Sequence, residues 1–89
     1  MKKLEDYPNI GVGIAAQLKA IGIFNMNQLE QMGSKRVMMR LRENNHKIDI
    51  QTFFKIDACL KNIPWYQLTQ EERNHLRDFF KTMDRYIET

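Results

Sequence analysis

The stretch YPNIGVGIAAQLKAIGI, from Tyr7 to Ile23, contains a tight turn followed by a run of small and apolar residues. Gly11 gives the backbone the freedom to bend sharply, and Asn9 tolerates the left-handed conformation better than most residues. Ile10 lies between them and is expected to anchor the turn in the core. The stretch therefore predicts a turn leading into a helix. It leaves two roles open for that turn, which could grip a nucleic-acid backbone or pack helices together.

Apolar residues recur at helical spacing along the rest of the chain, and no segment alternates like a strand. Asn25, Ser34 and Asp49 are predicted to cap successive helices, and Thr69 with Glu72 predicts a capping box. The helix that follows is the longest and is strongly amphipathic; its apolar positions are Leu76, Phe79, Phe80, Met83, Tyr86 and Ile87. The sequence predicts an all-α domain over residues 1–89, a compact bundle of about five short helices with a longer C-terminal one.

Length and composition restrict the function. A chain of 89 residues, 43% of them hydrophobic, supports a helical core but argues against an elaborate enzyme. The net charge of +3 is small, so any electrostatic recognition must come from a local patch. Cys59 is the single cysteine and is expected in the core, without a disulfide. The first residues do not form a signal peptide, and no apolar run approaches the roughly 20 residues of a membrane span. We therefore expect a cytoplasmic protein without membrane contact.

The opening stretch resembles the helix-hairpin-helix motif, in which amides at the start of the second helix point at a phosphate. DNA-binding hairpins follow the second glycine with a lysine and a hydroxyl residue, whereas this chain has Gly13 and Ile14. The candidate phosphate contacts are therefore the backbone amides of Val12, Gly13 and Ile14, with Lys19 about two turns away. The missing charge favours a packing role for the turn.

The order YPNIG…AAQLKAIGI…LEQMG…RL…FFKIDACLKNIPWYQL resembles the C-terminal domain of the TfoX/Sxy family, bacterial proteins associated with the regulation of natural competence. The resemblance covers about Leu4 to Met83. It implies a SAM-domain-like helical fold and a non-enzymatic regulatory role through protein contacts. Two-domain family members carry an N-terminal domain, which we expect to be absent because Met1 lies just before the turn. The first half is also similar to the C-terminal domain of the bacterial RNA polymerase alpha subunit.

A basic helix, SKRVMMRLRENNHK, offers a further candidate surface. Its cations are Lys35, Arg36, Arg40, Arg42 and Lys47. They could contact a phosphate backbone, or they could form an ordinary solvated face. Together with the hairpin amides they define the alternative function, which is weak, sequence-independent DNA binding.

The favoured function uses a protein partner or a homodimer. Apolar positions on the last helix exceed what a core of this size needs, and two aromatic residues follow Pro64; the candidate interface is Trp65, Tyr66, Phe79, Phe80, Tyr86 and Ile87. His46 and His75 lack companion ligands, so no metal site is expected. Asp57 is expected in a salt bridge or cap. We expect no catalytic residues, no cofactor and no small-molecule substrate.

Overall fold

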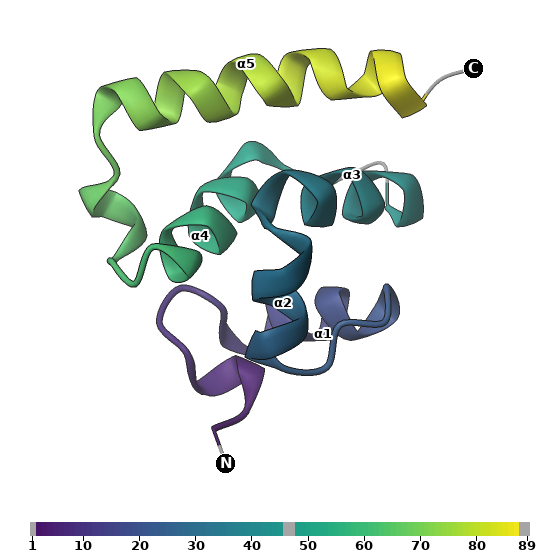
Figure 1. The fold of residues 1–89 in the computed structure, drawn as a ribbon, viewed down its shortest axis with the longest axis vertical. Helices are drawn as coiled ribbons and strands as arrows, with labels where there is room; N and C mark the ends of the chain where they lie inside the picture. Colours follow the sequence, from purple (N-terminus) through teal and green to yellow (C-terminus); the bar gives the residue numbers. More distant parts are fainter. Residues whose placement is uncertain (1, 46–47, 88–89) are drawn as a thin grey trace.

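The computed structural model describes residues 2–45 and 48–87 (Figure 1). Its elements are η1 (Leu4–Asp6), α1 (Gly11–Ala20), α2 (Met26–Met32), α3 (Ser34–Asn44), α4 (Ile50–Leu60), η2 (Trp65–Gln67) and α5 (Gln70–Ile87). The described residues include no strand. The predicted all-α bundle of about five helices with a longer C-terminal helix is confirmed.

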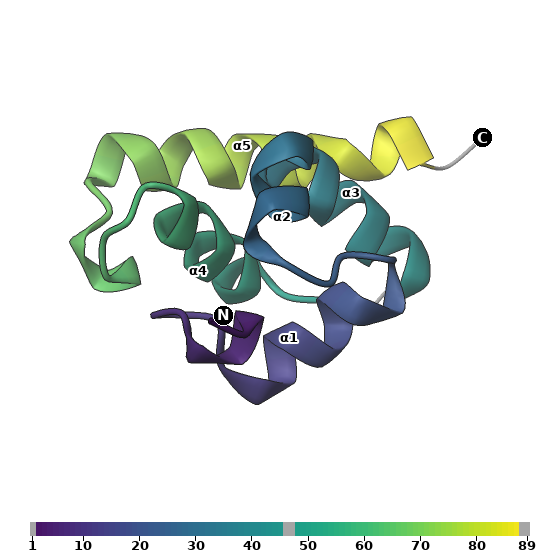
Figure 2. The same cartoon turned by 60° about the horizontal axis from the view of Figure 1, so that its bottom comes forward.

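Helix α3 lies at the centre of the bundle, where it contacts α1, α2, α4 and α5. Helix α5 runs across α3 and α4 on one side of the molecule, and α1 with η1 lies on the opposite side (Figures 1 and 2). The N-terminal turn and the C-terminal helix are therefore on separate surfaces. This separation decides which candidate residues can act together.

The core collects side chains from every α-helix. The large, fully buried side chains are Leu4, Leu18, Ile23, Leu29, Val37, Met38, Leu41, Phe53, Ile56 and Met83. Each stabilises the fold by about 1.5–3 kcal/mol relative to an exposed position. Phe53 also packs against Phe79 of α5, with 5.9 Å between the ring centroids. The inner face of α5 is therefore fixed to α4.

Local capping signals in the sequence are confirmed at three helix starts. Asn25 and Asp49 each accept the N–H of the residue three positions later, at 2.9 and 3.0 Å. At the start of α5, the Thr69 hydroxyl accepts the Glu72 N–H at 3.1 Å. A Glu72 carboxylate oxygen accepts the Thr69 N–H at 3.0 Å. These reciprocal bonds satisfy two amides that the helix itself leaves free.

The prediction that Ser34 caps α3 is wrong. Gly33 occupies the N-cap position with a φ of 81°, and Ser34 is the first residue of the helix. Its hydroxyl donates instead to Oδ1 of Asp57 at 2.7 Å, and both residues are buried. The hydroxyl therefore joins α3 to α4 rather than closing its own helix end.

The N-terminal turn has the predicted backbone. Asn9 and Gly11 have positive φ values of 76° and 65°, and Ile10 between them is buried. The element before the turn is the three-residue 3₁₀ helix η1. The hairpin therefore consists of one 3₁₀ turn, a bend and α1.

Candidate functional site

The side chain of Asn9 connects the N-terminal turn to a distant loop. Its Nδ2 donates to the carbonyl of Ile63 at 2.8 Å, and its Oδ1 accepts the N–H of Trp65 at 3.1 Å. Both partners lie between α4 and α5, more than 50 positions along the chain. Both ends of the amide are used inside the protein, and the turn holds these segments together.

The candidate hairpin amides lie at an open helix start. Val12 is 76% exposed, Gly13 is exposed and Ile14 is half-buried. The N-cap residue of α1 makes no side-chain capping bond, and its first turn carries no acidic residue. Lys19 lies 3.9 Å from the Glu5 carboxylate. The amides are accessible, but the predicted supporting lysine already has an acidic neighbour.

Some cations of the basic helix are exposed to solvent, and one makes contacts within the fold. The exposed cations are Lys35, Arg36 and Arg40. Arg42 is half-buried; its Nη1 donates to the Ile48 carbonyl at 3.1 Å, and its guanidinium lies 5.4 Å from the ring centroid of Phe80. Arg42 therefore braces the loop before α4. Lys47 lies outside the described residues.

The hairpin amides and the basic helix do not form one compact patch. Arg36 and Arg40 share surface hollows with residues 20–23, at the C-terminal end of α1. The amides of residues 12–14 lie at the other end of this helix. A ten-residue helix is about 15 Å long. The two candidate contributors to DNA binding are therefore separated by the length of α1.

Three shallow hollows meet around Arg36 and Arg40. We call this area the methionine surface and define it by the residues that line the hollow between α2 and α3: Met32, Arg36, Met39, Arg40 and Glu43. Neighbouring hollows extend it to residues 20–23 and to the start of α2. Phe24, which follows these residues, is 61% exposed. The sequence alone did not predict this surface, because it forms only when α1, α2 and α3 are packed together.

Three of the four described side chains in the predicted aromatic interface are half-buried. Phe79 and Phe80 are half-buried and pack against the core. Trp65 is also half-buried, with the Lys55 ammonium 5.7 Å from its ring centroid. Tyr66 is 67% exposed. The side chains of the remaining two members, Tyr86 and Ile87, lie outside the described residues.

A charged network joins α4 to α5. Asp57, which accepts the Ser34 hydroxyl, lies 2.7 Å from the Lys61 ammonium, and Lys61 donates to Glu72 at 2.7 Å. Burial by itself lowers the pKa of Lys61. Its bonds to Asp57 and Glu72 have the larger combined effect, so the pKa of Lys61 is above its usual value. Lys61 and the Thr69 N–H lower the pKa of Glu72 to about 2. The network orients helices, as expected for Asp57.

Comparison with protein families identifies the fold. The family model described as the TfoX C-terminal domain matches residues 1–80. The chain belongs to this family. The match confirms the resemblance carried by the hairpin, the following helices and the PWYQL segment. The TfoX C-terminal domain is a regulatory-type domain rather than a known enzyme family. None of the curated proteins shows a significant match to this chain.

Two solved structures share the fold of this TfoX C-terminal domain. One is an uncharacterized protein from Listeria monocytogenes (triclinic form), with 24% identity and a TM-score of 0.88 over 93% of this chain and 94% of that chain. The other is a protein of unknown function from the same organism (tetragonal form), with 25% identity and a TM-score of 0.86 over 90% of this chain and 99% of that chain. Both likenesses concern the helical arrangement.

The described part of this TfoX C-terminal domain offers little for a metal site or a membrane span. Within residues 2–45 and 48–87, no group of three or more His, Cys, Asp or Glu side chains could hold a metal ion. His75 is exposed, and His46 lies outside the described residues. Cys59 is buried as predicted, and burial raises the pKa of its thiol. No helix in the described part has the length and apolar composition to cross a membrane.

Proposed function

We propose that this TfoX C-terminal domain is a non-enzymatic regulatory module that binds a partner protein through the methionine surface. The observation that carries the proposal is the meeting of three hollows around Arg36 and Arg40, beside Met32 and Met39. By the family resemblance, the regulated process is natural competence, and the site of action is the cytoplasm.

The composition of the surface favours a protein over a nucleic acid. Methionine side chains are flexible and polarizable, so they adapt to an apolar partner. Methionine and arginine are both enriched in protein interfaces. Glu43 lines two of the hollows together with Arg40. A carboxylate in that position repels phosphate but can pair with a cation of a partner protein.

Site-specific photo-crosslinking tests the proposal. A photoreactive residue replaces Met39 in one variant and Gln51, exposed on α4, in a matched control. Irradiation of cells that make the full chain should give one discrete adduct from position 39 and none from position 51. Adding Arg36→Glu and Arg40→Glu should remove the adduct. A product of twice the chain mass would identify the partner as a second copy. Equal adducts from both positions, or none from position 39, would contradict the proposal.

One observation supports the alternative, weak DNA binding through the hairpin amides and residues 35–47. The start of α1 is uncapped by any side chain, and a Cβ at Gly11 or Gly13 would meet no atom within 4 Å. Such an open helix start can accept a phosphate. Duplex binding measured by fluorescence anisotropy should then weaken in Arg36→Glu/Arg40→Glu. Equal binding by this variant and the wild type would remove the basic helix from the alternative.

A further inference from the structure

We propose that one side of α5 is a binding surface for the phosphate backbone of a nucleic acid. Four cations recur at every fourth position of this helix, and we call them the α5 basic stripe: Arg73, Arg77, Lys81 and Arg85. Residues four apart lie on the same helix side about 6 Å apart along the axis, so the stripe spans about 18 Å. Arg77, Lys81 and Arg85 are exposed.

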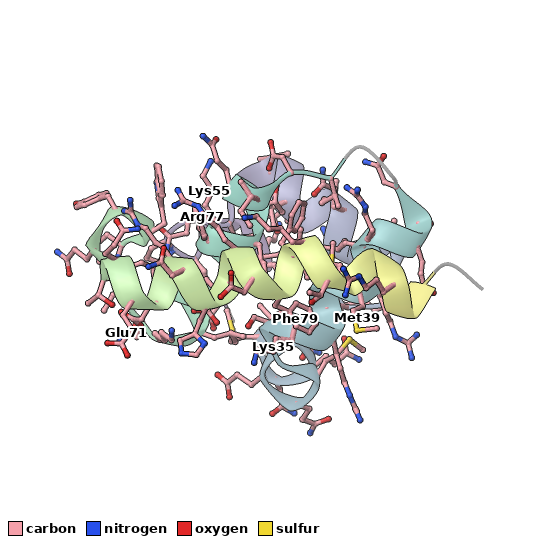
Figure 3. All side chains as sticks on the ribbon, turned by 90° about the horizontal axis from the view of Figure 1, so that it is seen from above. Lys35, Met39, Lys55, Glu71, Arg77 and Phe79 are labelled. Carbon is pink, nitrogen blue, oxygen red and sulfur yellow. The ribbon has the colours of Figure 1, made fainter. Side chains whose placement is uncertain are left out.

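Aromatic rings hold the first part of the stripe in place. The guanidinium groups of Arg73 and Arg77 lie 5.9 and 5.7 Å from the ring centroid of Phe54, which is buried in α4. Lys55 extends the same side, with its ammonium over the ring of Trp65. Lys55 and Arg77 project on one side of α5 in Figure 3. Cations positioned in this way lose less freedom when they bind a ligand.

The exposed cations of the stripe form no ion pair with any carboxylate whose side chain the structure describes. Among the side chains that the structure describes, the ion pairs involve Lys19 and Lys61, and none involves Arg77, Lys81 or Arg85. The side chain of Asp84, three positions after Lys81, lies outside that set. Neighbouring cations of the stripe lie four positions apart, a spacing at which like charges repel. Asp78 lies three positions before Lys81, and Glu71 projects on the side of α5 opposite Arg77 (Figure 3). The stripe is thus available to an external anion.

The shape of the charge favours a nucleic acid as the occupant. A row of cations at a constant step, inclined across the surface of the helix, matches a linear polyanion, and guanidinium groups pair well with phosphate oxygens. An exposed aromatic residue, Tyr66, lies at the beginning of the row, because its carbonyl accepts a bond from Arg73 at 3.2 Å. A tyrosine there can bond to a phosphate or stack on an unpaired base. Basic grooves combined with aromatic side chains bind single strands without sequence preference.

The stripe is separate from both other candidate surfaces. Lys35 and Met39 project on the side of α5 opposite Lys55 and Arg77 (Figure 3), and α1 lies across the molecule (Figure 1). A nucleic acid on the stripe therefore leaves the methionine surface free for a protein. This geometry fits a module that contacts two macromolecules at once, and the inference stands without the proposed protein contact.

Fluorescence anisotropy with labelled duplex and single-stranded DNA tests the proposal. The stripe variant Arg77→Gln/Lys81→Gln/Arg85→Gln is compared with a matched control on α3, Lys35→Gln/Arg36→Gln/Arg40→Gln. Each removes three positive charges, so the net charge falls from +3 to 0 in both. For the wild type on duplex DNA, log K against log salt should have a slope of about −3.6, from about 0.9 for each of four phosphates. Circular dichroism checks that both variants are folded.

The stripe variant should bind at least about tenfold more weakly at about 50 mM salt, with a slope about 2.7 shallower. The α3 control should stay within about threefold of the wild type. If the stripe variant does not fold, Lys81→Gln/Arg85→Gln replaces it, with a slope about 1.8 shallower.

Three results would overturn the proposal. The wild type could fail to bind either DNA, or the two triple variants could weaken binding equally. Polyglutamate could also displace DNA as effectively as unlabelled DNA does, which would assign the stripe to an acidic protein. A larger effect of Tyr66→Ala on the single strand than on the duplex would support base stacking at the end of the stripe.

Discussion

Asn9 in the N-terminal turn and Arg77 in α5 are both polar side chains near the surface, but the fold uses them differently. Both ends of the Asn9 amide bond to backbone groups of Ile63 and Trp65. Arg77 rests on an aromatic ring, and its charge has no carboxylate partner in the described residues. The turn resembles a DNA-binding motif yet serves packing, whereas α5 carries no motif yet offers free charge. The motif that resembles a DNA-binding hairpin and the cations that are available to bind DNA therefore lie in different parts of this domain.

The largest expected effect comes from breaking the Asn9 connection. Asn9→Ala removes two hydrogen bonds, which contribute about 0.5–1.5 kcal/mol each. It also places alanine, which tolerates the left-handed region less well than asparagine, at a φ of 76°. We expect the free energy of unfolding to fall by about 2–4 kcal/mol, measured by urea denaturation. Asn9→Gly keeps the backbone conformation and should lose about 1 kcal/mol less. An unchanged free energy in Asn9→Ala would show that the turn does not depend on this side chain.

A smaller loss is expected at Ser34. Ser34→Ala leaves Oδ1 of buried Asp57 without its hydroxyl donor, and an unmet buried acceptor costs about 1–3 kcal/mol. Chemical denaturation should resolve this difference. Gln51→Ala, on the exposed surface, serves as the control and should change the unfolding free energy by less than about 0.5 kcal/mol. If both variants behave like the wild type, the bond between α3 and α4 contributes nothing measurable.

The charged network between α4 and α5 predicts that the stability of the fold decreases at low pH. The pKa of Glu72 falls from 4.5 to about 2 on folding, so its stabilising contribution is complete above pH 4.5 and is lost as the pH falls toward 2. Thermal unfolding between pH 7 and pH 2 should show a decline in Tm across this interval. Glu72→Gln cannot titrate there and should decline less steeply. Parallel curves for the two proteins would be evidence against the network.

The smallest effect on stability is expected at the α5 basic stripe. Arg77→Gln/Lys81→Gln/Arg85→Gln relieves like-charge repulsions of about 0.2–0.5 kcal/mol per pair, and it loses one cation–aromatic contact of about 0.5–1 kcal/mol. These terms nearly cancel, so the unfolding free energy should stay within about 0.5 kcal/mol of the wild type. A loss above about 2 kcal/mol would mean that the stripe serves the fold, as Asn9 does.

Local signals in the sequence predicted the helices and their caps well. Contacts between residues far apart in the sequence were not predicted. The caps at Asn25, Asp49 and Thr69 involve residues three positions apart, so spacing alone reveals them. The Ser34 bond to Asp57 spans 23 positions, and no local pattern distinguishes it from a cap. The Asn9 bonds span more than 50 positions and depend on the packed structure for the same reason.

The candidate surfaces divide in the same way. The methionine surface needs three helices to be brought together, so it could not be read from spacing. The α5 basic stripe was readable as four cations at a constant step of four. The stripe was not predicted, because the polar side of an amphipathic helix is normally charged and α5 carries acidic residues as well. Lys19 and Arg42 were predicted as nucleic-acid contacts, but the fold gives both intramolecular contacts.

An NMR titration of the labelled full chain with duplex DNA tests the contrast between the turn and α5 most directly. We expect amide shift changes at Arg77, Lys81 and Arg85 and none at Val12, Gly13 or Ile14. Shift changes centred on residues 12–14, with α5 unaffected, would contradict it and return the phosphate-binding role to the hairpin.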